Sequence, residues 1–91
     1  MFVFNINGSS RYPAPLGYTS WLAYWNSHAS HTAYLCGAAD CHQLENLVGA
    51  HVQKAFGTDH NWYIVPLCSR CNQRTESFFV DEELVPVPSN L

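Results

Sequence analysis

The chain of 91 residues contains four cysteines, which fall in two close pairs. Cys36 and Cys41 enclose four residues, Cys68 and Cys71 enclose two, and 26 residues separate the pairs. Zn²⁺ prefers four soft ligands at the corners of a tetrahedron, and one short turn with two cysteines supplies two of them. The spacing therefore predicts that the chain folds back on itself, so that both turns bind one structural zinc ion.

Two disulfides, or four buried free thiols, are the alternatives to a zinc site. The chain begins MFVFNINGSS, which lacks a basic region and has too short an apolar run for a secretory signal. No segment approaches about 18 consecutive apolar residues, so we expect no membrane span. We therefore expect a cytoplasmic chain, where paired cysteines are more often metal ligands than disulfides. A metal would also stabilise a domain this small.

Three histidines are candidates for further metal ligands. His42 directly follows Cys41 and could replace it in a mixed site. His28 and His31 lie three residues apart, but no cysteine or carboxylate stands near them in the sequence. We interpret His28 and His31 as ordinary surface or core histidines.

The N-terminal part of the chain is expected to contain an arm and a helix. Residues 1–16 resemble an extended or turn-rich arm, because FVFNI alternates in polarity and an Asn-Gly pair then marks a turn. Residues 19–28 have the spacing of an amphipathic helix that Thr19 or Ser20 can cap. The two tryptophans expected to pack on the core are Trp21 and Trp25.

Two β-like runs, 47–53 and 61–67, follow the first cysteine pair. A mostly polar connection with a glycine joins them, so we expect them to pair as antiparallel strands. Residues 72–77 have the composition of a short helix. The chain is thus expected to form one domain in three parts: an arm and helix (1–32), a zinc-bound ββα core (33–77) and a C-terminal tail (78–91).

The order of these features is that of a treble-clef zinc finger: a cysteine pair, a strand with His51, a loop, a second strand, then LCSRCN opening a helix. This order resembles the HNH (His-Me finger) nuclease family, in many members of which a four-cysteine zinc site surrounds a ββα core. The resemblance covers about residues 33–77, and is specific in PLCSRCN but weaker at GAHV. It implies a small α+β fold: a treble-clef or ββα-metal zinc finger core with an N-terminal amphipathic helix.

Carried onto this sequence, the resemblance implies a metal-dependent endonuclease that hydrolyses DNA phosphodiesters. His51 would be the general base that activates water, since a neutral imidazole can accept a proton near pH 7. Asn72 would help to hold a catalytic Mg²⁺ or Mn²⁺ beside the scissile phosphate, where the cation stabilises developing charge. Asn61 would be the middle asparagine that orients the base.

The sequence departs from the family pattern at two positions. Ala50 precedes His51 where many members carry an acidic or histidine metal ligand, so Asn72 would hold the cation with water molecules alone. Asn61 has three competitors for the role of the middle asparagine. These are Asn46, Asp59 and His60.

Charge limits the affinity that the chain can have for nucleic acid. The net charge is −3, and the only cations are Arg11, Lys54, Arg70 and Arg74. Because Lys and Arg neutralise phosphates in nucleic-acid complexes, this composition argues against tight non-specific DNA binding. A lightly basic DNA surface would have to come from Lys54, Arg70 and Arg74.

The alternative is a catalytically silent treble-clef zinc module that mediates protein or nucleic-acid interactions. His51 would then be a semi-buried strand histidine, and Asn72 would cap a helix or bond a ligand sulfur. A nuclease needs an accessible His51 with Asn72 within reach of the same cation, whereas a binding module can bury His51. Aromatic residues are enriched at protein interfaces, and the candidates are Tyr12, Tyr18, Tyr24 and Tyr34.

Overall fold

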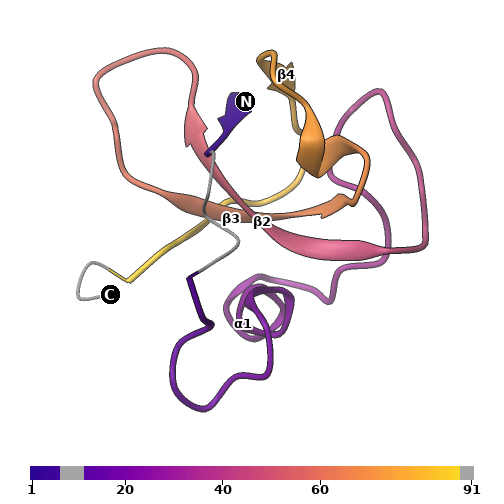
Figure 1. Cartoon of the computed structure of the whole chain (residues 1–91), viewed down its shortest axis with the longest axis vertical. Coiled ribbons are helices and arrows are strands. Elements are labelled where there is room, and N and C mark those ends of the chain that lie inside the picture. The colour runs from indigo at the N-terminus through magenta and orange to yellow at the C-terminus, as the bar shows by residue number, and fades with distance from the viewer. Residues whose placement is uncertain (7–11, 89–91) are drawn as a thin grey trace.

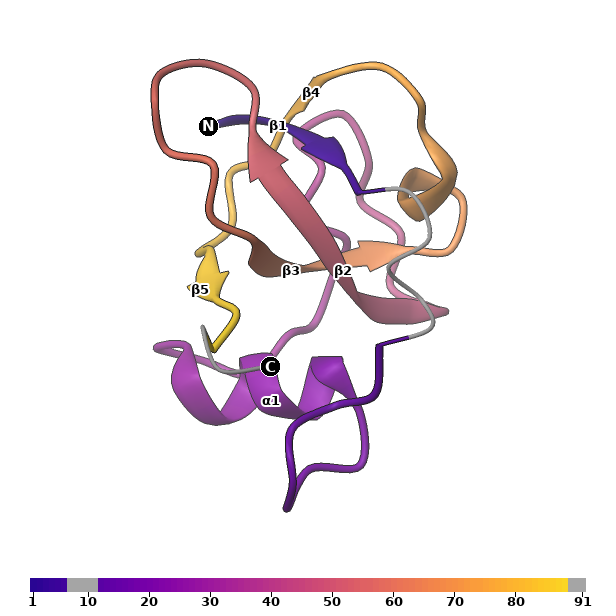
Figure 2. The same ribbon diagram turned by 60° about the vertical axis from the view of Figure 1, so that its left-hand side comes forward.

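The structure, a computed structural model, describes residues 1–6 and 12–88. Its elements are β1 (Phe2–Asn5), α1 (Trp21–His28), β2 (Leu47–Lys54), β3 (Tyr63–Cys68), the 3₁₀ turn η2 (Cys71–Gln73), β4 (Phe78–Phe79) and β5 (Val85–Pro86). The strands form one antiparallel sheet of order β4-β1-β2-β3-β5. Figures 1 and 2 show α1 below the crossing strands β2 and β3, so the chain has a small α+β fold.

The two predicted β-like runs form β2 and β3, and they pair antiparallel over six residue pairs as expected. Side chains alternate between the two faces of a strand. Ala50 and Val52 of β2 therefore share one face with Val65 of β3, while His51 and Ile64 point to the other. The hairpin thus presents a different set of side chains to each side of the sheet.

The two faces of the hairpin are covered by two separate hydrophobic clusters. The cluster on the α1 side consists of Trp21, Tyr24, Trp25, Ile64 and Val85. The cluster on the opposite side contains three buried cysteines. Its other members are Val3, Ala38, Ala50, Val52, Val65, Leu67, Phe78 and Val80.

The start of the segment predicted as an extended or turn-rich arm is an inner strand of the sheet. β1 lies between β2 and β4 and pairs with both. Val3 is fully buried while Phe2 and Phe4 are exposed, which follows the alternation visible in the sequence. The part of the predicted arm between residues 7 and 11 lies outside the described residues.

The C-terminal segment forms the two edges of the sheet. β4 pairs with β1 at one edge, and β5 pairs with β3 at the other. Pro86 lies in β5, where an edge strand tolerates the missing N–H of proline. The predicted tail over 78–91 therefore contributes two short strands to the sheet.

The predicted amphipathic helix is confirmed as α1. Ser20 caps it, since its hydroxyl accepts a hydrogen bond from the backbone N–H of Ala23 at 3.0 Å. The helix lies unusually close to β2 at Gly49, where a Cβ would be 2.5 Å from backbone atoms of Trp21 and Leu22. Among the described residues, no helix has the length and apolar character needed to span a membrane.

The prediction of a short helix over 72–77 is wrong. Only the single turn η2 forms, and Arg74 is already extended, with ψ of 141°. Asn5 explains this early end, because its side-chain amide donates to the carbonyl oxygens of Cys71 and Arg74, both at 3.0 Å. These bonds tie the turn to β1, and the chain then returns to the sheet as β4.

Candidate metal centre and the pocket beside His51

The two cysteine pairs come together as the sequence predicted. The sulfur atoms of Cys36, Cys41, Cys68 and Cys71 all lie within 4.8 Å of one another. Cys41 Sγ is 3.9 Å from Cys68 Sγ, and tetrahedral Zn–S bonds of about 2.3 Å would place sulfurs about 3.8 Å apart. All four cysteines are free thiols. This tetracysteine cluster can hold a metal ion such as zinc.

The first cysteine turn is closed by its own backbone hydrogen bonds and is joined to β3 by one more. The N–H of Cys36 donates to the carbonyl of Gln43 at 2.8 Å, and the N–H of Cys41 donates to Ala38 at 3.0 Å. Gly37 donates to the carbonyl of Pro66 at 2.7 Å. A Cβ at Gly37 would lie 2.9 Å from that carbonyl oxygen, so the close approach requires glycine.

The second cysteine turn favours a thiolate at Cys68. Burial by itself raises the pKa of the Cys68 thiol. The backbone N–H of Cys71 and the thiols of Cys71, Cys41 and Cys36 donate hydrogen bonds to Cys68, and together they lower its pKa to about 7. Burial raises the pKa of the Cys71 and Cys36 thiols. Since the thiolate is the metal-binding form, Cys68 is the cysteine best prepared to bind a cation.

The histidines near the cysteines in sequence do not join the cluster. His42 is exposed, and Cys41 supplies the ligand atom from that turn. His28 Nδ1 lies 2.9 Å from the carbonyl oxygen of Tyr24. His31 Nε2 lies 3.2 Å from a carboxylate oxygen of Glu82, a partner that is distant in sequence. His28 and His31 thus have separate environments and form no second metal site together.

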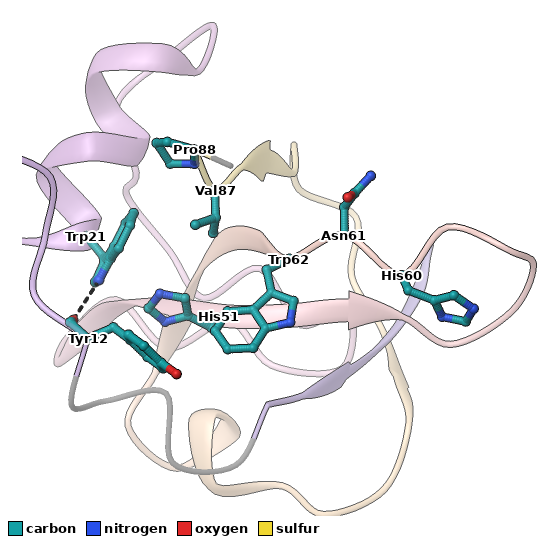
Figure 3. Close-up of a pocket in the computed structure, with 8 residues that line it drawn as sticks. All are labelled: Tyr12, Trp21, His51, His60, Asn61, Trp62, Val87 and Pro88. Atoms are coloured by element: carbon teal, nitrogen blue, oxygen red, sulfur yellow. Dashed lines mark hydrogen bonds between the residues drawn. The ribbon is translucent and has the colours of Figure 1, made fainter. Parts of the chain in front are cut away.

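His51 is buried against aromatic rings on the α1 face of the sheet. Its side chain is 4% exposed. The imidazole meets Trp21 edge-on with ring centroids 4.7 Å apart, and Trp62 with centroids 6.0 Å apart (Figure 3). Burial lowers its pKa, so the neutral imidazole is favoured. Its Nε2 atom is buried and has no hydrogen-bond partner among the described residues.

The structure places His51 between two hollows of the surface. One groove contains both His51 and Asn72, along with Ser20, Leu22 and Gly49. This groove thus brings together two of the residues that the family resemblance singled out. Asn72 is exposed and is the middle residue of η2.

The second hollow is a pocket of about 380 Å³, which we call the tryptophan pocket. Its lining includes Tyr12, Trp21, His51, Asn61, Trp62 and Val87. Asn61 lies at its rim, and Figure 3 shows its side-chain amide pointing away from the imidazole of His51. Asn61 and Asn72 thus lie on different sides of the histidine.

The three competitors of Asn61 have other roles in the structure. Asp59 accepts hydrogen bonds from the Tyr63 hydroxyl and the Asn61 N–H, and it forms an ion pair with Lys54 at 3.1 Å. These three contacts hold the pKa of the Asp59 carboxyl below its usual range. The backbone carbonyl of His60 accepts from Gln53, and its exposed imidazole lines the tryptophan pocket described above (Figure 3). Asn46 has φ of 58°, the left-handed conformation that asparagine tolerates at a turn.

Two of the three cations expected to contact DNA are already paired with carboxylates. Lys54 pairs with Asp59, and Arg74 lies 2.7 Å from an oxygen of Asp40. Arg70 is exposed, and Arg11 lies outside the described residues. The lightly basic surface predicted from the sequence is therefore partly neutralised.

Sequence reasoning missed Asn5 and the pairing of Trp62 with Tyr12 and His51. Asn5 is a polar residue in an otherwise apolar strand, which was a usable signal. Trp62 precedes β3 directly and meets Tyr12 edge-on with centroids 5.5 Å apart, a contact that no local pattern reveals. Comparisons with protein-family models, curated proteins and solved structures found no match.

Proposed function

We propose that this chain is a zinc-stabilised binding module with the two cysteine turns and the hairpin of a treble clef but without its helix, in which the tetracysteine cluster holds a structural Zn²⁺. The observation that carries the proposal is the approach of four sulfurs to within 4.8 Å of one another. Four cysteine ligands fill the four positions of tetrahedral zinc and leave none for a reactive water. Such a centre supplies folding free energy rather than catalysis.

The environment of His51 supports binding over catalysis. The imidazole of His51 is packed against Trp21 and Trp62 with its Nε2 covered, so the water that a general base deprotonates does not reach Nε2 unless a ring moves. Ala50 faces the cysteine side of the sheet and has no ligand atom to offer a catalytic cation. The aromatic lining and the net charge of −3 favour an uncharged or cationic partner over a polyanion.

Metal analysis tests the structural role of the cluster. Purified protein is expected to contain one zinc per chain, and a strong chelator is expected to abolish its cooperative thermal unfolding. Cys68→Ser should lose both the zinc and the fold. Ser69→Ala, at an exposed position between the two cysteines, should retain both. A chain that unfolds at the same temperature with and without the chelator would overturn the proposal.

The second candidate function is the HNH-type endonuclease, because His51 and Asn72 line one groove. In this mechanism His51 would take a proton from water, and Asn72 would help to hold a Mg²⁺ or Mn²⁺ that stabilises charge on the phosphate. The zinc of the cysteine cluster would remain structural.

DNA cleavage separates the two functions. Zinc-loaded protein is incubated with supercoiled and linear DNA in Mg²⁺ or Mn²⁺, with a control in EDTA. His51→Ala is compared with His42→Ala, which changes an exposed histidine. Cation-dependent nicking that disappears only in His51→Ala would establish the endonuclease. The absence of cleavage, or equal cleavage by both variants, favours the binding module.

A further inference from the structure

We propose that the tryptophan pocket beside His51 is a binding site for a flat, uncharged nitrogen heterocycle, such as a purine base or nucleoside. This inference rests on the proposed binding function and names the class of ligand. Three features of the pocket support it: the walls, the unpartnered nitrogen of His51, and the absence of charge from the described lining.

The walls of the tryptophan pocket are aromatic rings, of which Trp21 is held in place by a hydrogen bond. The indole N–H of Trp21 donates to the carbonyl of Tyr12 at 3.0 Å, which ties the helix to the segment that precedes it. Trp62 stands edge-on to both Tyr12 and His51. Small-molecule sites are typically concave and aromatic with few polar groups, and the volume of about 380 Å³ lies at the small end of their range. This size suits a nucleoside better than a large cofactor.

Whereas His60 and Asn61, which also line the pocket, are exposed, the buried polar group in this lining is the imidazole of His51. Its buried Nε2 has no hydrogen-bond partner among the described residues, and a buried polar atom without a partner is unfavourable. A neutral imidazole nitrogen either donates or accepts, depending on the tautomer. A heterocycle that carries an N–H donor beside an unprotonated ring nitrogen presents a donor and an acceptor along one edge. It can therefore match either tautomer of His51. A hydrocarbon ring offers neither.

The lack of Lys, Arg, Asp and Glu in the described lining favours an uncharged ligand. Among the described residues, the pocket lining contains no Lys, Arg, Asp or Glu. The described cations Lys54 and Arg74 are already in ion pairs and do not line the pocket. A phosphate would therefore gain little, and a nucleoside is expected to bind at least as tightly as the corresponding nucleotide.

We expect a ligand to reach the imidazole of His51 by displacing the side chain of Trp62. Nε2 is covered in the structure, so a ligand must displace part of its cover. Trp21 is buried and bonded to Tyr12, whereas Trp62 is half-buried and has no side-chain hydrogen bond among the described residues. Trp62 is therefore the ring that can move while the rest of the pocket stays in place.

The test is a binding titration of the zinc-loaded full chain with adenosine, followed by tryptophan fluorescence and by NMR of the His51 ring nitrogens. AMP, an oligodeoxyadenylate and toluene are the comparison probes. Saturable binding of adenosine with a shift of the His51 Nε2 resonance is expected, with toluene at least about tenfold weaker. An oligodeoxyadenylate that binds more tightly than adenosine would identify single-stranded nucleic acid as the source of the base, and equal binding would identify a free nucleoside.

Variants locate the site. Trp62→Ala and His51→Phe should each weaken adenosine binding by about tenfold, the usual size of one lost stacking or hydrogen-bonding partner. Tyr34→Ala, an exposed aromatic residue that does not line the pocket, should leave it unchanged. Zinc content and melting temperature are measured on each sample.

The outcomes distinguish this inference from the proposed function. A zinc-loaded, folded chain that shows no saturable adenosine binding overturns the ligand assignment and leaves the zinc module intact. Equal affinity for adenosine and toluene, or binding that His51→Phe leaves unchanged, overturns it as well. A chain without zinc that still folds contradicts the proposed function instead.

Discussion

The side-chain amide of Asn5 lies 3.0 Å from the carbonyl oxygen of Cys71, although 66 positions separate the two residues in the sequence. A second bond from the same nitrogen reaches the carbonyl of Arg74. Asn5 therefore fastens the inner strand β1 to the turn that carries the last cysteine of the cluster. The N-terminal strand and the candidate metal centre are in this way one structural unit.

Asn5→Ala is expected to loosen the second cysteine turn. The substitution removes the amide donor from the carbonyl oxygens of Cys71 and Arg74, of which the Cys71 oxygen keeps the backbone N–H of Arg74. The lost bonds should lower the free energy of unfolding by about 1–3 kcal/mol. It should also accelerate the loss of zinc to a chelator, which a colorimetric zinc indicator records. Asn72→Ala, an exposed amide next to Cys71, is the matched control. Equal rates of zinc loss in the two variants would contradict the role of Asn5.

The local patterns of the sequence predicted the parts that depend on short-range spacing. The paired cysteines, the helix with Trp21 and Trp25, and the hairpin of β2 and β3 all form where the residues indicated. In the helix and the hairpin, a repeat of three or four residues and of two residues, respectively, selects the structure and also decides which side chains face the core.

Other features depend on long-range pairing and were not predictable. β4 and β5 have two residues each and exist because β1 and β3 offer them free edges. The helix expected after Cys71 is cut short by Asn5, which comes from the other end of the chain. The burial of His51 depends on Trp21 and Trp62, which approach it from two different elements.

Trp25→Phe is expected to destabilise the contact between α1 and the C-terminal segment. Trp25 is fully buried, and its indole N–H donates to the carbonyl of Glu83 at 2.8 Å. Phenylalanine would leave a cavity and remove the donor, so the free energy of unfolding should fall by about 1–3 kcal/mol. Chemical denaturation measures this loss. Trp62→Phe, at a half-buried tryptophan, should lower the free energy of unfolding by less than half as much. A larger loss in Trp62→Phe would contradict the prediction that Trp25 contributes more to stability.

Gly49→Ala is expected to push α1 away from β2. The new Cβ would lie 2.5 Å from backbone atoms of Trp21 and Leu22, and backbone cannot move aside as a flexible side chain can. The free energy of unfolding should decrease by about 1–3 kcal/mol or more, and the fluorescence of the tryptophans should change. Val48→Ala, at the neighbouring exposed position, provides the control. A Gly49→Ala protein as stable as that control would show that the helix does not pack this closely.

His51 should make the stability of the domain decrease at acidic pH. Burial lowers the pKa of its imidazole below the ordinary value of 6.5. Above pH 6.5 the ring is neutral in both the folded and the unfolded chain, so it contributes no pH dependence. Below pH 6.5 the unfolded chain takes up the proton more readily, and the free energy of unfolding falls by up to about 1.4 kcal/mol per pH unit. The loss stops at the pKa of the folded state.

The comparison of wild type with His51→Phe isolates this effect, because acid protonates the cysteine ligands equally in both proteins. Denaturation is measured at intervals between pH 8 and pH 5, and the difference in stability between the two proteins should change in favour of the variant below pH 6.5. An NMR titration of the wild type should give a His51 midpoint below 6.5. A difference that stays constant with pH, or a midpoint at 6.5 or above, would show that the imidazole is not enclosed by Trp21 and Trp62 in solution.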